Sequence, residues 1–165
     1  MEALSLPRKY RTMLAPSSAL QLITDPRTVR ETLRRCFDHL QPGGPFVTPF
    51  AFDWRPGDPL DTGWELLFEK VRPEDGATVR HWTREWREPE HQLWHAESRF
   101  EVERDGNVLA TEYQSRSPEG RWYTQDQVVQ LFREVGVSDV LLLHEFTHEP
   151  ARSDDRLFTA VGVKA

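Results

Sequence analysis

The sequence has little cysteine and no long apolar run, and each scarcity excludes a class of protein. One cysteine, Cys36, cannot form an internal disulfide, which excludes a disulfide-stabilised scaffold and fits the reducing cytoplasm. No stretch approaches the roughly 18 apolar residues that cross a bilayer. Residues 1–11 also lack the apolar core and cleavage site of a signal peptide. We therefore expect a cytoplasmic protein with no membrane partner.

The sequence also lacks any block of one charge. Charged residues make up 29% of the chain and its net charge is −6, with both signs mixed along its length. A protein that binds nucleic acid usually carries a basic stripe, so no nucleic-acid partner is expected. Internal repeats and low-complexity tracts are absent too. The 165 residues fit a single domain, 1–165, made of three sections that differ in pattern.

Residues 1–53 have the pattern of a strand, a helix and a second strand. Residues 12–15 are an apolar run that predicts a buried strand. Asp25 then caps a helix that begins at Pro26 and ends before the proline and glycines of 42–44. Residues 46–52 are apolar on both faces, which is typical of a covered parallel strand. An α/β fold follows from this order. The helix carries one apolar stripe, made of Val29, Leu33, Phe37 and Leu40.

In residues 54–122, apolar residues no longer recur with the helical period, and apolar and polar residues alternate instead. The alternation over 94–102 and over 81–86 predicts half-exposed strands. The turn residues 105–107 then lead into a further strand, 108–114, which is a hairpin signal. This section is expected to be an antiparallel β extension.

Residues 123–165 predict a helix and two closing strands. Thr124 and Gln127 form a capping box at the start of the helix, and Gly136 ends it. Strands are expected over 139–146 and 157–163, with a polar turn between them.

The ordered series of these segments resembles one known family. Residues 6–22 are similar to the fourth strand and following loop of class I S-adenosylmethionine-dependent methyltransferases. The stretch 25–44, which ends in His-Leu-Gln-Pro-Gly-Gly, is similar to that family's next helix. Residues 123–137 and 157–164 resemble its last helix and its final antiparallel strand. The resemblance therefore implies strands four to seven of a Rossmann-like methyltransferase sheet, with S-adenosylmethionine as cofactor and a small-molecule acceptor.

One departure from the family concerns the cofactor site. The family binds its cofactor at a glycine-rich turn after the first strand, and no G-x-G-x-x-G-like run occurs here. The chain resembles the C-terminal half of the family, so we expect either self-association or a missing N-terminal half. Whether this chain is an enzyme by itself stays open. The alternative is a non-catalytic, methyltransferase-like binding or partner subunit.

The resemblance assigns site residues to the carboxyl end of the predicted fourth strand. It places Pro16, Ser17 and Ser18 at the methyl donor. Four residues are expected at the acceptor: Gln21, Trp54, Trp122 and Tyr123. The alternative for 16–21 is an ordinary turn with a helix cap. The other tryptophans and Cys36 are expected to pack in cores. No residue is assigned as catalytic.

Residues 144–148 spell H-E-x-x-H, the pattern of zinc metallohydrolases. On a helix, His144 and His148 would lie about 6 Å apart and Glu145 would act as the base. The run before them instead predicts a strand, in which four residues span about 13 Å. No metal site is therefore expected here, and the zinc hydrolase is the least favoured function.

Overall fold

A computed structural model describes residues 4–51 and 54–165 of the chain. The chain divides into two compact units, residues 1–55 with 120–165, and residues 56–119.

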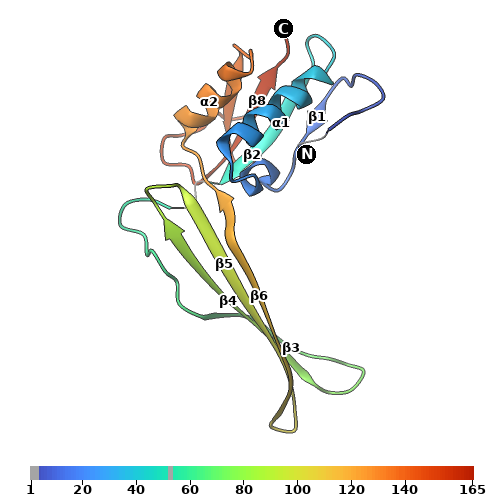
Figure 1. Cartoon of the computed structure of the whole chain (residues 1–165), viewed down its shortest axis with the longest axis vertical. Helices are drawn as coiled ribbons and strands as arrows, with labels where there is room; N and C mark the ends of the chain where they lie inside the picture. Colours follow the sequence, from blue (N-terminus) through green and yellow to red (C-terminus); the bar gives the residue numbers. More distant parts are fainter. Residues whose placement is uncertain (1–3, 52–53) are drawn as a thin grey trace. The chain divides into compact units, whose positions relative to one another are not determined.

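The first unit is a mixed sheet with helices (Figure 1). Its strands lie in the order β1-β2-β8-β7, where β1 is parallel to β2 and β8 is antiparallel to both β2 and β7. The final antiparallel strand expected from the resemblance is therefore confirmed. The elements of this unit are β1 (Met13–Leu14), η1 (Ala19–Leu22), α1 (Pro26–Asp38), β2 (Pro45–Ala51), α2 (Gln125–Glu134), β7 (Val140–His144) and β8 (Leu157–Val163).

Both predicted helix caps are present. The Asp25 side chain accepts a hydrogen bond from the backbone N–H of Thr28 at 2.8 Å, and Pro26 begins α1. Thr124 and Gln127 form the reciprocal capping box of α2. These bonds satisfy N–H groups that the first turn of a helix leaves without a partner.

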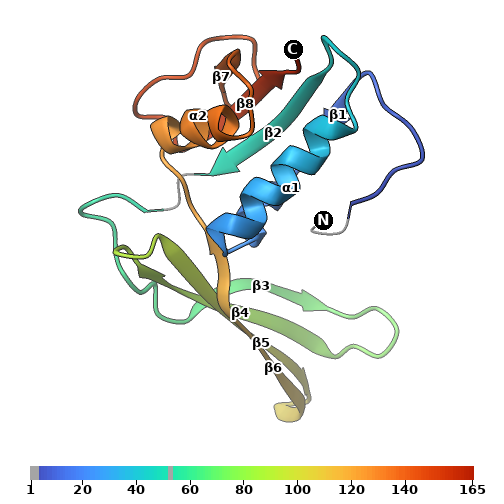
Figure 2. The same cartoon turned by 45° about the horizontal axis from the view of Figure 1, so that its top comes forward.

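The helices α1 and α2 lie on the same face of the sheet and bury it (Figure 2). The predicted stripe is buried: Val29, Leu33 and Phe37 lie in α1, and Leu40 lies just beyond its end. Aromatic rings fill the space between helices and sheet, with Phe37 and Phe46 ring centroids 5.7 Å apart. Cys36 belongs to this core, as expected, and burial raises the pKa of its thiol to about 11.

The opposite face of the same sheet carries a row of aliphatic side chains. Leu14, Val47, Val161 and Leu141 are direct partners across β1, β2, β8 and β7 in turn. Leu14 is 62% exposed and Leu141 is 53% exposed. We call these four residues the open-face row. An apolar row of this kind on one face is typical of a surface that another element covers.

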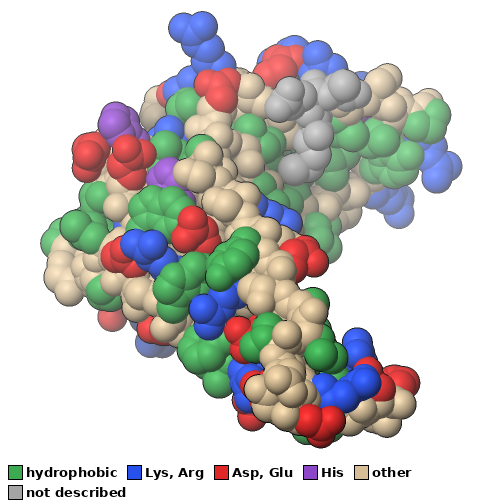
Figure 3. Space-filling model, turned by 60° about the horizontal axis from the view of Figure 1, so that its bottom comes forward, with side chains coloured by type: hydrophobic (Ala, Val, Ile, Leu, Met, Phe, Trp, Pro, Cys, Tyr) green, Lys and Arg blue, Asp and Glu red, His purple; other side chains and the backbone are tan. Residues whose placement is uncertain are grey.

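The second unit is a four-stranded antiparallel sheet in the order β3-β4-β5-β6. On this sheet, Arg80 pairs with Glu69 and Glu103, and Arg84 pairs with Asp61. Side chains of both charge signs lie beside one another on the surface that Figure 3 shows. The predicted hairpin 94–114 is confirmed. The bounds of the strands are β3 (Glu65–Val71), β4 (Thr78–Glu88), β5 (Leu93–Arg104) and β6 (Asn107–Arg121).

Two predicted boundaries differ from the structure. The strand expected over 139–146 ends at His144, because Glu145 adopts a positive φ of 48° and turns the chain. The alternation of apolar and polar residues also does not predict β3, because a bulge between Leu66 and Phe68 breaks the period of two. Neither α-helix in the described part of the chain has the length and apolarity needed to cross a bilayer.

Candidate functional site at the carboxyl edge of the mixed sheet

The carboxyl ends of β1 and β2 meet at one edge of the mixed sheet. The two strands are parallel, so their carboxyl ends point to the same edge. Residues 15–22 follow β1, and the described chain resumes at Trp54 after β2. In open α/β sheets this edge, beyond the carboxyl ends of the strands, is where ligands bind. The candidate site is therefore built from these segments.

The loop after β1 has an unusual backbone. Ser17 and Ser18 both adopt left-handed conformations, with φ of 55° and 52°. This region is uncommon for residues other than glycine and costs free energy, and such residues cluster at ligand sites. Neither serine hydroxyl bonds to another described residue, and Pro16 and Ser17 are exposed. The loop thus presents two hydroxyls at the sheet edge that no described residue engages.

Gln21 anchors this loop to two other segments. Its side chain is fully buried, and its amide nitrogen donates to the carbonyls of Ala51 at 2.8 Å and Arg121 at 3.1 Å. The backbone N–H of Ala51 donates in turn to the Gln21 side-chain oxygen at 2.6 Å. Gln21 therefore joins η1 to the end of β2 and to Arg121 within the first unit. Because both the nitrogen and the oxygen of its amide are bonded, Gln21 holds these segments in a fixed arrangement.

The expected aromatic residues gather beside these anchored segments. The Trp54 and Trp122 ring centroids lie 6.4 Å apart, with Trp122 buried and Trp54 half-buried. Tyr123 packs edge-on against Phe50 with centroids 6.0 Å apart. The Tyr123 hydroxyl is buried without a hydrogen-bond partner among the described residues, and burial raises its pKa to about 12. The structure therefore brings Trp54 and Trp122 together, whereas the Tyr123 ring belongs to the hydrophobic core.

A hollow of about 230 Å³ continues the same edge toward β8 and β7. Its lining combines hydroxyl, carboxylate and aromatic groups, from Thr124, Gln125, Asp126, Ser153, Asp155 and Phe158. The Arg55 guanidinium donates to the backbone carbonyl of Asp155 at 3.0 Å. Sequence reasoning missed Arg55, Arg121 and Asp155, since no local pattern signals contacts across 100 residues.

His144 lies in β7, as the strand prediction required. Its Nδ1 is 2.8 Å from the Asp155 carboxylate. Bonds from the Arg152 backbone N–H and from His144 hold the Asp155 pKa below its usual value. No group of potential metal ligands among the described residues includes His144, Glu145 or His148. The H-E-x-x-H run is thus a strand end and a turn.

Comparison with known proteins identifies the fold. Neither the family models nor the curated proteins give a match to the sequence. Solved structures do match. A methyltransferase from Clostridium acetobutylicum, described as S-adenosylmethionine-dependent, has a TM-score of 0.72 at 16% identity, over 99% of this chain and 62% of its own.

Two further solved structures also match this chain. The CcbJ methyltransferase from Streptomyces caelestis has a TM-score of 0.74 at 16% identity, over 98% of this chain and 64% of its own. The sugar N-methyltransferase KedS8 from a Streptoalloteichus species has a TM-score of 0.71 at 19% identity, over 99% of this chain and 59% of its own. The chain spans about six-tenths of the length of each of these three proteins. It therefore has the class I, Rossmann-like fold of S-adenosylmethionine-dependent methyltransferases over nearly its whole length.

Proposed function

We propose that this chain forms the acceptor-facing part of an S-adenosylmethionine-dependent methyltransferase that acts on a small molecule. One observation carries the proposal. The strained loop 16–18 and the aromatic residues Trp54 and Trp122 lie at the carboxyl edge where β1 and β2 end. The fold shared with methyltransferases adds support.

The loop Pro16–Ser18 would contact the methyl donor. S-adenosylmethionine supplies a methyl group on a positively charged sulfur. The Ser17 and Ser18 hydroxyls have no partner among the described residues and can bond to the donor's polar groups. Gln21 holds the loop to Ala51 and Arg121, so that the donor and acceptor sides of the site keep their spacing.

The acceptor would pack against Trp54 and Trp122. Indole faces attract apolar surfaces and cationic groups alike. Methyl transfer depends mainly on alignment of the acceptor with the methyl group and on exclusion of water. This chain's contribution is therefore orientation, and no residue is assigned as a catalytic acid or base. KedS8 is described as a sugar N-methyltransferase, so a sugar amine is the first acceptor to test.

A further polypeptide segment would complete the donor site. The sequence has no glycine-rich turn of the kind that approaches a nucleotide cofactor. We propose that a segment with such a turn adds a strand beside β1 and covers the open-face row, because that face exposes Leu14 and Leu141. The single buried cysteine fits a cytoplasmic setting for this assembly.

The second candidate is a non-catalytic subunit with the same fold, and the absent glycine-rich turn favours it. Such a subunit would keep the aromatic wall and bind small molecules without methyl transfer. Donor binding by the assembled protein separates the two functions.

The test is a methyl-transfer assay on the protein as purified from its own cells. Methyl-labelled S-adenosylmethionine and a panel of sugar amines should yield a labelled small molecule. Replacing Trp54→Ala should raise KM by about tenfold with a smaller change in kcat, because binding contacts are lost. The matched control Trp64→Ala, in the other unit, should leave both constants unchanged. Absence of label in every acceptor, with no donor binding, would favour the non-catalytic subunit.

A further inference from the structure

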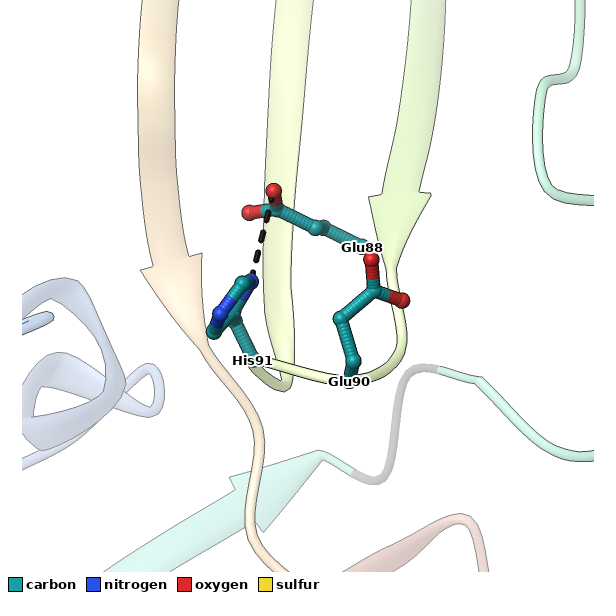
Figure 4. A group of neighbouring side chains, drawn as sticks. All are labelled: Glu88, Glu90 and His91. Carbon is teal, nitrogen blue, oxygen red and sulfur yellow. Dashed lines mark ion pairs between the residues drawn. The ribbon is translucent and has the colours of Figure 1, made fainter.

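The turn between β4 and β5 gathers metal-binding side chains. Glu88 ends β4, and Glu90 and His91 follow in the turn (Figure 4). One ligand atom from each of these three residues lies within 4.8 Å of the other two. The His91 Nδ1 is 3.4 Å from a Glu88 carboxylate oxygen. The turn is held by a backbone bond from the His91 N–H to the Glu88 carbonyl at 3.1 Å.

A buried imidazole faces the same carboxylate from the neighbouring strand. His95 of β5 is only 9% exposed, and its Nε2 lies 3.8 Å from the second Glu88 oxygen. Its Nδ1 bonds to the Ser117 hydroxyl at 2.8 Å, and its ring stacks on Trp86 with centroids 4.9 Å apart. The Nε2 itself makes no hydrogen bond with a described residue. Support of one ring nitrogen by a neighbouring polar group, with the other left facing carboxylates, is the usual arrangement of a metal-bound histidine.

The charges around this turn differ from those on the rest of the sheet. Elsewhere the carboxylates of Glu69, Glu103 and Asp61 are paired with arginine. In the described structure, Glu88 pairs only with the two histidines, and Glu90 makes no ion pair. The carboxylates of Glu88 and Glu90 therefore have no lysine or arginine partner among the described residues and remain available to a cation.

The geometry points to a zinc site formed by Glu88, Glu90, His91 and His95. Two imidazoles with two carboxylates form a set that suits Zn²⁺, whereas Mg²⁺ and Ca²⁺ prefer oxygen ligands throughout. Zinc bonds of about 2.1 Å place tetrahedral ligand atoms roughly 3.4 Å apart. The ligand atoms of Glu88, Glu90 and His91 lie within 4.8 Å of one another, and the His95 Nε2 is 3.8 Å from Glu88. These separations exceed the tetrahedral value by up to about 1.4 Å, which the exposed Glu90 and His91 side chains can close by rotation. Bound zinc would join the turn to β5 and stabilise this sheet.

Competition with a chromogenic chelator, using zinc alone as the probe, tests the site on the full chain. The wild type should bind one Zn²⁺ per chain at micromolar concentration or below. Glu90→Gln and His91→Asn, both exposed, should each weaken binding at least tenfold. His148→Asn is the matched control and should bind as the wild type does.

Thermal unfolding supplies an independent readout. Zinc should raise the Tm of the wild type and of His148→Asn, and should leave the Tm of His91→Asn unchanged, since a ligand of the native state stabilises it. No binding at 100 equivalents of zinc, or binding that His148→Asn abolishes and Glu90→Gln does not, would overturn the assignment. Neither outcome bears on methyl transfer, because the proposed methyl-transfer site uses none of these residues.

Discussion

Gln21 shows how one buried side chain can determine the geometry of a site. Replacing Gln21→Leu keeps the volume but leaves the N–H and carbonyl of Ala51 and the carbonyl of Arg121 without this partner. Unsatisfied buried groups cost about 1–3 kcal/mol each, so for these three groups we expect a loss of at least about 3 kcal/mol in the free energy of unfolding. Urea denaturation measures this loss in the free energy of unfolding. The exposed Gln41→Leu should change stability by less than about 0.5 kcal/mol.

Tyr123 gives a prediction that depends on pH. Burial raises the pKa of its phenol to about 12, above the ordinary value of 10.0. The neutral phenol is favoured in the folded state, so its contribution to stability is complete below pH 10 and is lost as pH rises from 10 toward 12. The Tm of the wild type should therefore fall more steeply over this range than that of Tyr123→Phe.

The exposed Tyr113 provides the control for this measurement. Tyr113→Phe should follow the wild type at every pH. Parallel curves for Tyr123→Phe and the wild type would show that the buried phenol does not titrate as described.

At the scale of elements, Gly162 determines how closely β8 approaches α2. A Cβ atom at this position would lie 2.4 Å from the Phe132 ring, well inside van der Waals contact. Gly162→Ala should therefore destabilise the first unit by about 1–3 kcal/mol. The double variant Gly162→Ala with Phe132→Leu should be more stable than the sum of the single effects predicts. Additive effects in urea denaturation would contradict this packing.

The sequence predicted those elements whose signals are local. The caps at Asp25 and Thr124 and the apolar stripe of α1 depend on neighbours within four residues, and all three are confirmed. The bulged strand β3 was not predicted, because one extra residue shifts its pattern to the other face. The bonds of Gln21 to Ala51 and Arg121 join residues 30 and 100 positions apart, and no periodicity encodes such distances.

At the scale of the whole molecule, the open-face row predicts how the isolated chain behaves. Without its proposed covering segment, this apolar face should associate with other copies at tens of micromolar, as apolar patches do. Light scattering should then give a mass above 19.3 kDa. Leu14→Lys with Leu141→Lys should reduce that mass to the monomer.

The control for this measurement places lysine in the other unit. Leu67→Lys with Leu109→Lys substitutes two equally exposed leucines and should leave the association unchanged. A monodisperse wild-type monomer would count against the proposed role of the open-face row.

Donor binding tests the account as a whole most directly. Isothermal titration of S-adenosylmethionine into the protein purified from its own cells should show one site per chain with micromolar affinity. Ser17→Val with Ser18→Val should weaken that binding about tenfold, because both hydroxyls are proposed to contact the donor. No heat at millimolar S-adenosylmethionine would contradict the proposal that the carboxyl edge of β1 and β2 is a methyl-donor site.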